Sequence, residues 1–401
     1  MMETAKGARR TDEYVEEEES RGDAPPEFPF LPPEMIREVL LRLPEKSIGR
    51  FRCVSKLFRS LSSDPAFAKA HLDLSLRNDA FPSGRRRLIV SYRHNLYTVD
   101  FDSVVDACDG IRDLGAVEIL QSPVKSNVVS SCYREGYWVG VVGSCNGLVC
   151  TTNVAGDVFL FNLTTGESKR IPGVLDLLNL GTERVRNCGF GFGFHAITDD
   201  YKLVALVMGD VLNASVYSLK TDSWKRVGDS RYEYDDDDTN YDGVLVNGAI
   251  HWVARHRENG RRVVVAFDLT TEQFKDMAFP DEADECPHRV RGFQLHKLNG
   301  RLCMVYNCFE KHGDFWVMNE YGVASSWARV RISVSYSSMK PLCSVRNEEE
   351  TLMELNGQLV LYNFRNDVST SLVLKDAELR CVMAADTYIE SLISPNQYGM
   401  A

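Results

Sequence analysis

A short pattern that recurs about every 50 residues limits the possible folds of this chain more than any other feature of its sequence. Each copy is the end of a strand, a polar turn, and an aromatic or small residue that opens the next strand. Clear copies begin at Asn162 (NLTTGESKRI), Ser218 (SLKTDSWKRV) and Asp268 (DLTTEQFKDM). Looser copies begin at Asn319 and Asn363. Such a period predicts one supersecondary unit repeated through the region.

A second signal supports the repeat. The residues that stand at matching places, separated by 56, 50 and 53 positions, are Ser168, Trp224, Phe274 and Trp327. Asn-Gly pairs between apolar alternations occur at Asn146-Gly147, Asn247-Gly248, Asn299-Gly300 and Asn356-Gly357. Because a two-residue hairpin turn needs positive φ at both central positions, each pair predicts a hairpin.

Together these signals predict a mainly β chain with a β-propeller over residues 85–395. Five units are visible, and a degraded unit beginning at Arg85 would make about six blades. A period near 50 with four strands per unit is typical of kelch-like blades. A pair of β-sandwiches is the alternative, and we favour the propeller because a single period runs through the region.

The first 76 residues have a different composition. Residues 1–27 carry nine acidic and four basic side chains, with Glu16 to Glu19 in a row, which predicts a disordered acidic tail. Residues 28–76 form a helical segment with eight bases and five acids. Pro33 is suited to the first turn of a helix, and Pro44 ends that helix. Asp64-Pro65 predicts the start of a later helix.

This helical segment has more apolar side chains than three or four short helices can hide. The rest of the chain, or a partner, must therefore cover them. The residues that we expect to bind such a partner are Leu31, Pro32, Ile36, Val39, Leu40, Leu43, Pro44, Ile48, Phe51, Val54 and Phe58.

Bulk composition argues against several classes of protein. The net charge of −11 is unlike that of a general nucleic-acid binder. No apolar run approaches the roughly 20 residues of a membrane helix, so we expect no membrane insertion. The 11 cysteines are odd in number and scattered, and the chain opens without a secretory leader. We therefore expect the protein to be located in the cytoplasm and nucleus.

The sequence predicts no catalytic residue, no metal site and no cofactor. His251 and His256 lack ligand partners at metal-binding spacing, and Cys145 in GSCNG is explained by the hairpin that follows it. The GFGFGF run from Gly189 suits a strand near a crowded axis. The acidic run Asp235–Asp238 is most simply a solvated loop, and any partner there would present a basic patch.

The helical segment resembles an F-box. The stretch LPPEMIREVLLRLPEKSIGRFRCVSKLFRSLSSDPAF has that family's Leu-Pro, Ile/Leu-rich helix, second Leu-Pro, Arg-rich helix, Val-x-Lys and Asp-Pro-x-Phe. Ser55 stands where Cys is usual, and Phe58 replaces the common Trp. The stretches GSCNGLVC, FNLTTGESKRIP, GFGFHAITDDYKLVAL, SLKTDSWKRV and LNGRLCMVY are similar to the F-box-associated, kelch-like domain of plant F-box proteins.

The resemblance implies a non-catalytic substrate receptor of an SCF ubiquitin ligase. The F-box would bind a Skp-type adaptor and, through it, the cullin and RING subunits. The propeller would bind a protein target for ubiquitination and degradation, with an immune receptor as one expected target. A non-degradative F-box scaffold and a propeller enzyme are the alternatives.

Overall fold

The computed structural model describes residues 31–77, 85–92, 95–106, 112–120, 122, 139–153, 156–174, 188–207, 212–234, 242–280, 293–306, 312–345, 349–375, 382 and 384–398. The chain divides into two compact units, Met1–Leu40 and Leu41–Ala401. The predicted acidic tail and the acidic run Asp235–Asp238 lie outside the described residues.

Short helices form the beginning of the described chain. The first unit contains α1 (Pro33–Leu40), and the second begins with α2 (Glu45–Phe51), α3 (Lys56–Ser62) and α4 (Pro65–Arg77). The predicted start signals are confirmed: α1 begins at Pro33, and the Asp64 carboxylate accepts a hydrogen bond from the Ala66 N–H (3.0 Å) as α4 begins. Ser55 is the N-cap of α3, since its hydroxyl accepts a hydrogen bond from the Leu57 N–H (3.1 Å).

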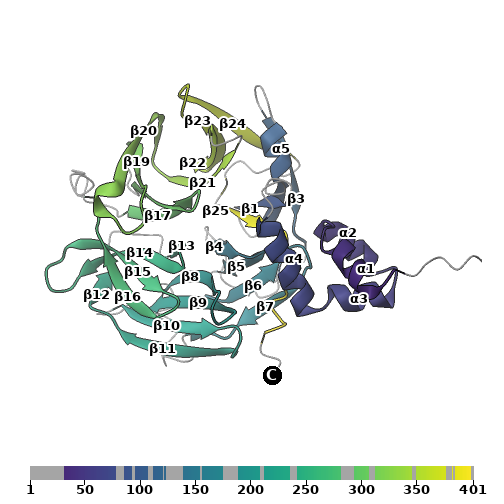
Figure 1. Ribbon diagram of the computed structural model, residues 1–401. Helices are drawn as coiled ribbons and strands as arrows, with labels where there is room; N and C mark the ends of the chain where they lie inside the picture. Colours follow the sequence, from purple (N-terminus) through teal and green to yellow (C-terminus); the bar gives the residue numbers. More distant parts are fainter. Residues whose placement is uncertain are drawn as a thin grey trace, which may run out of the picture. The chain divides into compact units, whose positions relative to one another are not determined.

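The described strands from Arg86 onward group into six antiparallel blades around a central axis (Figure 1). Blade 1 consists of β25 (Ala384–Ile389), β1 (Arg86–Tyr92), β2 (Asn95–Asp100) and β3 (Arg112–Glu118), and blade 2 of β4 (Gly140–Cys145), β5 (Leu148–Thr152), β6 (Val158–Asn162) and β7 (Ser168–Ile171). Blade 3 consists of β8 (Cys188–His195), β9 (Asp200–Val207), β10 (Asn213–Ser218) and β11 (Ser223–Asp229). Blade 4 consists of β12 (Tyr232–Tyr234), β13 (Val244–Val246), β14 (Ala249–His256), β15 (Arg262–Asp268) and β16 (Gln273–Met277).

The last two blades follow the same order. Blade 5 consists of β17 (Phe293–Leu298), β18 (Arg301–Tyr306), β19 (His312–Met318) and β20 (Trp327–Tyr336), with the 3-10 turn η4 (Ala324–Ser326) before β20. Blade 6 consists of β21 (Met339–Val345), β22 (Glu350–Leu355), β23 (Gln358–Asn363) and β24 (Val368–Lys375). The prediction of a mainly β chain with about six blades is confirmed.

The hydrophobic core lies between neighbouring blades. Leu206 of blade 3 and Ile250 of blade 4 belong to one buried cluster. Similar clusters lie between blades 1 and 2, 4 and 5, 5 and 6, and 6 and 1. The Trp327 indole N–H donates to the Ala278 carbonyl (2.9 Å), joining the outer strand of blade 5 to the segment that follows blade 4. The repeated aromatic positions therefore hold adjacent blades together.

A strand from the far end of the chain closes the ring. The innermost strand of blade 1 is β25, which pairs antiparallel with β1 from Arg86↔Ile389 to Ser91↔Ala384. The Arg87 guanidinium donates to the Glu390 carboxylate (3.0 Å) beside this pair. The degraded first unit of the repeat is therefore completed by residues about 300 positions later.

Glycine brings the innermost strand of blade 3 close to blade 4. A Cβ added at Gly191 of β8 would lie 2.3 Å from Cγ2 of Ile250 and 3.0 Å from Cζ2 of Trp252. A Cβ at Gly193 would lie 2.8 Å from the side chains of Leu245 and Leu269. The prediction that this Gly-Phe run is a strand near the axis is confirmed.

The Asn-Gly pairs form the predicted hairpins, but one pair has a different place in its blade. All four pairs have positive φ at both residues, from 49° to 85°. The first three join the innermost strand of a blade to its second strand, whereas Asn356-Gly357 joins the second and third strands of blade 6. The interval of 57 residues before Asn356 is therefore not a repeat of equivalent turns.

Blades 1 and 6 share one sheet. Their outer strands β3 and β24 pair in parallel, from Leu372↔Arg112 to Lys375↔Gly115, which gives a continuous sheet of eight described strands. The short helix α5 (Phe101–Asp106) contributes Phe101 and Val104 to the core between these blades. The periodicity of the sequence carried no signal for this pairing.

Candidate functional site

Helix α1 exposes large apolar side chains. Val39 is 54% exposed, and Leu31, Pro32 and Met35 are exposed as well. Leu40 is buried. A short helix with this composition presents an apolar surface to any partner that reaches it.

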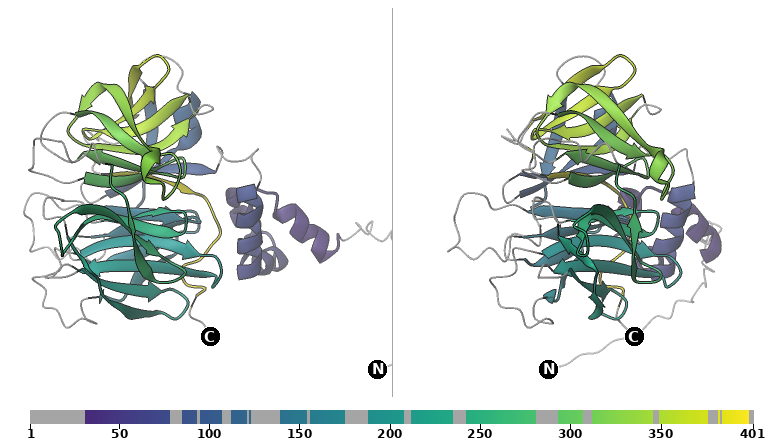
Figure 2. Two further views of the ribbon diagram at one scale, coloured as in Figure 1. Left: turned by 60° about the vertical axis from the view of Figure 1, so that its left-hand side comes forward. Right: turned by 90° about the vertical axis from the view of Figure 1, so that its left-hand side faces the viewer.

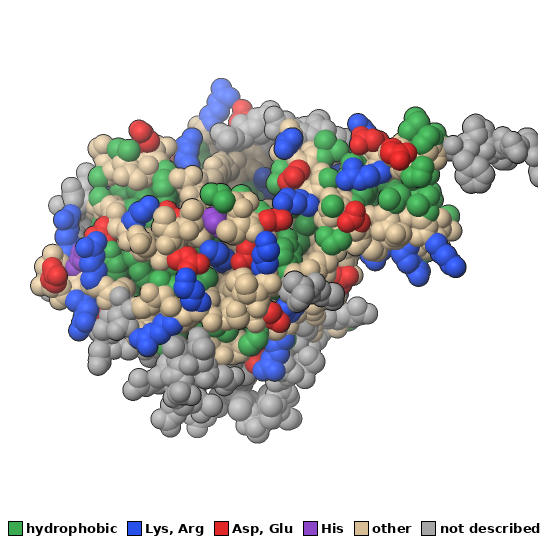
Figure 3. Space-filling view, turned by 60° about the horizontal axis from the view of Figure 1, so that its bottom comes forward, with side chains coloured by type: hydrophobic (Ala, Val, Ile, Leu, Met, Phe, Trp, Pro, Cys, Tyr) green, Lys and Arg blue, Asp and Glu red, His purple; other side chains and the backbone are tan. Residues whose placement is uncertain are grey.

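Helices α2 and α3 and the turn between them also expose apolar side chains. Val54 is 71% exposed, and Phe51 and Leu57 are exposed to a smaller degree. The Phe51 and Phe58 rings contact each other edge to face, with 5.6 Å between their centroids. Figure 3 shows apolar side chains, in green, on the surface of the helical segment.

The predicted adaptor-binding residues divide into three groups by exposure. Those exposed are Leu31, Pro32, Val39, Pro44, Phe51 and Val54, and those half-buried are Ile36, Leu43 and Phe58. Leu40 and Ile48 are buried, with exposed fractions of 3% and 0%, so in this structure they serve as core residues and offer no surface to a partner. Met35 and Leu57 are also exposed but are not among the predicted residues. The helical periodicity that predicts the other positions includes both.

A buried polar cluster supports α2 and α4. Glu45 and His71 are buried, and the His71 Nε2 lies 2.9 Å from the Leu43 carbonyl. The Arg85 guanidinium lies 3.2 Å from the Glu45 carboxylate. Burial lowers the pKa of His71, which favours the neutral ring. This interior role distinguishes Glu45 and His71 from the exposed apolar positions around them.

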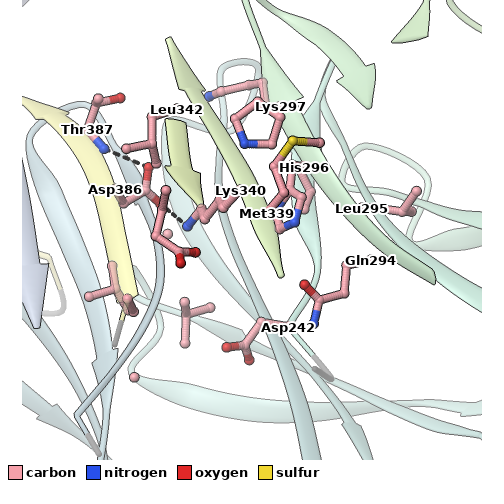
Figure 4. Close-up of a pocket in the computed structure, with 18 of the residues that line it drawn as sticks. Asp242, Gln294, Leu295, His296, Lys297, Met339, Lys340, Leu342, Asp386 and Thr387 are labelled. Atoms are coloured by element: carbon pink, nitrogen blue, oxygen red, sulfur yellow. Dashed lines mark hydrogen bonds and ion pairs between the residues drawn. The ribbon is translucent and has the colours of Figure 1, made fainter. Parts of the chain in front are cut away.

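The propeller encloses a cavity of about 790 Å³ along its axis. Residues from all six blades line it, among them Gly140 of β4, Phe192 of β8 and Gln294 of β17. Residues at or near the start of the innermost strands, such as Gly140 and Gln294, line this cavity. We call its opening at this end the N-terminal mouth. Figure 4 shows the side chains of blades 1, 4, 5 and 6 that extend into it.

Charged groups concentrate in this axial cavity. Asp242, Glu354, Asp386 and Lys340 line it, and the Lys340 ammonium lies 3.4 Å from the Asp386 carboxylate. Burial raises the pKa of Asp242 to about 6 and also raises the pKa of Glu354. Burial lowers the pKa of His296 to about 3, so this ring is neutral.

A second cavity, of about 300 Å³, lies where the innermost strands end. It shares Lys297 with the axial cavity, and Arg86 also lines it. Among the described residues that line this second cavity, none is acidic. The linings of the axial cavity and of the second cavity therefore differ in charge.

Comparison with known proteins accounts for both regions. Residues 28–69 match the F-box domain family, and residues 87–394 match the F-box associated beta propeller domain family. The second match alone spans more than half of the chain. This chain is an F-box protein with an F-box-associated β-propeller.

Curated relatives from Arabidopsis thaliana share this organisation over most of their length. F-box protein CPR1 is 28% identical over 391 residues, which cover 90% of this chain and 88% of the relative. F-box/kelch-repeat protein At3g23880 is 28% identical over 379 residues, covering 91% and 96%. An F-box domain implies binding to a Skp-type adaptor, and the relatives support a substrate-recognition F-box protein.

The side chains considered for catalysis lie in β4 and β14 of the propeller. Cys145 ends β4, just before the Asn146-Gly147 hairpin, and burial raises the pKa of its thiol to about 11. His251 is buried, and its Nε2 lies 2.8 Å from the Tyr321 hydroxyl. His256 lies 2.9 Å from the Asp276 carboxylate.

No three His, Cys, Asp or Glu side chains in the described part of the chain gather as metal ligands would. None of the described helices has the length and apolar character needed to cross a membrane.

Sequence reasoning missed the lining of the axial cavity. His296 and Lys340 lie within two innermost strands, and Asp242 lies just before a third. The repeat located those strands, but the side chains facing the axis differ from blade to blade. The sequence signal that could have identified this lining is a charged residue in a mainly apolar innermost strand, such as Lys340.

Proposed function

We propose that this F-box protein is the substrate-recognition subunit of an SCF-type ubiquitin ligase. Its F-box helices bind the Skp-type adaptor, which connects it to the cullin and RING subunits. Its propeller binds a protein target, which is ubiquitinated and then degraded by the proteasome. The exposure of Val39 and Val54 in a segment that matches the F-box family carries the proposal.

The adaptor contacts the exposed apolar side chains by a helix-in-groove mode. Apolar anchors on short helices gain stability when partner helices remove them from water. Each such side chain contributes about 1.5–3 kcal/mol when fully buried. The exposed members of the predicted set, with Met35 and Leu57, supply enough apolar surface for a tight complex.

The protein acts by proximity and contributes no catalytic group. It holds a lysine-bearing target near a ubiquitin-charged enzyme, which raises the effective concentration of the reacting groups. From the similarity to F-box protein CPR1 we propose an immune receptor as one candidate target. We also propose that the protein acts in the cytoplasm and nucleus, because its cysteines are odd in number and scattered along the chain.

Co-purification from cells tests this function. The full chain, tagged and expressed with and without a proteasome inhibitor, is isolated and its partners are identified by mass spectrometry. We expect the adaptor, the cullin and the RING subunit in both samples, and a ubiquitinated protein enriched when the proteasome is inhibited. Recovery of the adaptor without the cullin would instead indicate a non-degradative scaffold.

A further inference from the structure

The axial cavity has the size of a ligand site but a polar lining. Its volume of about 790 Å³ falls within the range of roughly 300–1,000 Å³ that is usual for ligand pockets. Ser144, Ser337, Ser338 and Thr387 line it together with the charged groups described above. An apolar ligand would leave these polar groups without water, so the occupant must itself be polar.

Acidic groups outnumber basic ones at the N-terminal mouth. Asp242, Glu354 and Asp386 come from three different blades, and Lys340 lies 3.4 Å from Asp386. Lys297 lies farther along β17, where the two cavities meet. An anionic ligand would face these carboxylates, whereas a cationic ligand would be attracted by them.

A buried histidine provides an independent sign of a ligand. His296 is only 5% exposed and lines the cavity, and it makes a backbone hydrogen bond with Met339. Its Nε2 is buried without a hydrogen-bond partner among the described residues. Figure 4 shows this ring on the same side of the cavity as Asp242 and Gln294. Because the ring is neutral, an unprotonated nitrogen accepts a hydrogen bond from a donor placed in the cavity.

The occupant is an organic cation with several donors. Within the described residues, no three His, Cys, Asp or Glu side chains converge as a metal ion requires. A guanidinium has five N–H donors in a planar arrangement, so it can satisfy a carboxylate, an amide oxygen and a ring nitrogen at the same time. Asp242, Gln294 and His296 present those three acceptors.

We propose that the propeller recognises its target by an arginine side chain that enters the N-terminal mouth and binds Asp242, Gln294 and His296. This inference rests on the proposed function, since the arginine belongs to the protein target. Arginine adds a positive charge to a lining that holds three carboxylates and two lysines, and its long flexible stem can reach them. A target without an exposed arginine is therefore a poor ligand.

Small probes test the cavity without knowledge of the target. N-acetyl-arginine amide and the neutral, nearly isosteric N-acetyl-citrulline amide are titrated into the purified full chain, and binding is followed by saturation-transfer NMR and calorimetry. For so small a ligand we expect a Kd in the ~millimolar range for the arginine probe. The citrulline probe should bind at least about tenfold more weakly, because it lacks the charge.

Variants locate the binding site. Asp242→Asn should weaken binding of the arginine probe at least about tenfold, and His296→Met should weaken it by a smaller factor. Glu320→Gln is the matched control, since Glu320 is an exposed carboxylate in the turn between β19 and β20. It should leave binding unchanged. Thermal unfolding of each variant shows whether the fold is retained.

Three results would overturn the inference: no binding of the arginine probe, equal binding of both probes, or full binding by a folded Asp242→Asn variant. If Asp242→Asn fails to fold, the same criterion applies to His296→Met. Capture of the adaptor and the cullin is measured on the same preparations. Failure of capture contradicts the proposed ligase function, whereas capture without discrimination between the probes contradicts only the arginine site.

Discussion

The docking helices and the propeller expose opposite kinds of side chain. The helices present Val39 and Val54 to solvent, while the propeller keeps apolar residues between its blades and lines its axial cavity with groups such as Asp242 and Lys340. A repeat covers its own apolar faces because each blade packs on the next. A segment of a few short helices has no such neighbour within itself.

The difference separates two recognition tasks. An apolar surface made of common side chains suits one constant partner, because its affinity depends mainly on the area removed from water. A polar cavity suits selection among many candidates, because a wrong ligand leaves buried polar groups unpaired. Changes in one region should therefore spare the function of the other, and the predictions below test that separation.

The largest expected effect is on adaptor binding. Replacing Val39 and Val54 with Asp should weaken adaptor affinity by more than about 100-fold, because two apolar contacts worth about 1.5–3 kcal/mol each are lost. Both side chains are more than half exposed, so the fold should persist. These positions are better suited than Leu43 and Pro44, since Leu43 is half-buried and Pro44 is the N-cap of α2. Affinity is measured by calorimetry with purified adaptor.

Ile197 provides the control for that experiment. It is 80% exposed in the hairpin between β8 and β9 of the propeller, so Ile197→Asp introduces the same chemistry outside the F-box. Its adaptor affinity should equal that of the parent chain. Equal affinities for the double variant and the parent would show that the exposed valines are not part of the interface.

A smaller effect is expected inside the propeller. Gly191→Ala places a methyl group 2.3 Å from Ile250, and overpacking of this kind costs about 1–3 kcal/mol. The midpoint of thermal unfolding should fall by roughly 2–6 °C. Gly115→Ala in β3 is the matched control, since its added Cβ would meet nothing within 4 Å. Adaptor affinity should be unchanged in both variants.

An unchanged melting temperature for Gly191→Ala would show that blades 3 and 4 separate easily. A loss of adaptor binding in that variant would more directly contradict the functional separation of the helices from the propeller. The two regions would then be coupled through the propeller core.

The smallest effect concerns pH. Burial raises the pKa of Asp242 to about 6, so between pH ~4 and ~6 the folded chain holds a proton that the unfolded chain releases. This group therefore lowers stability as pH rises through that window, although Lys340 reduces the penalty. Asp242→Asn should melt up to a few °C above the parent at pH 7 and at the same temperature near pH 4.

Measuring this difference against pH cancels the contributions of other groups. Burial lowers the pKa of His251 to about 4 and that of His296 to about 3, so both destabilise the fold below pH 6.5 in parent and variant alike. A difference in melting temperature that stays constant from pH 4 to pH 7 would contradict the assignment to Asp242.

Local rules in the sequence predicted much of the fold. The Asn-Gly pairs, the glycines of β8 and the start of α4 at Pro65 each follow from short-range chemistry, and the structure has all of them. The burial of Ile48 was not predicted, because helical periodicity shows which residues share a face but not which face is covered. The β24–β3 pairing and the position of Asn356-Gly357 depend on long-range closure, which leaves no local pattern.

The completion of blade 1 by β25 has a consequence for biosynthesis. The ribosome makes β1 to β3 near the start of the propeller but makes Ala384–Ile389 after every other strand described. The hydrogen bonds of the Asn162 side chain in blade 2 also form late, because its amide donates to the carbonyls of Ser391 and Ile393. A chain interrupted by a premature stop codon just before Ala384 would still carry the adaptor-binding helices, but it would lack β25, so its ring would stay open. Such a product would occupy adaptor without holding a target and would compete with the intact protein.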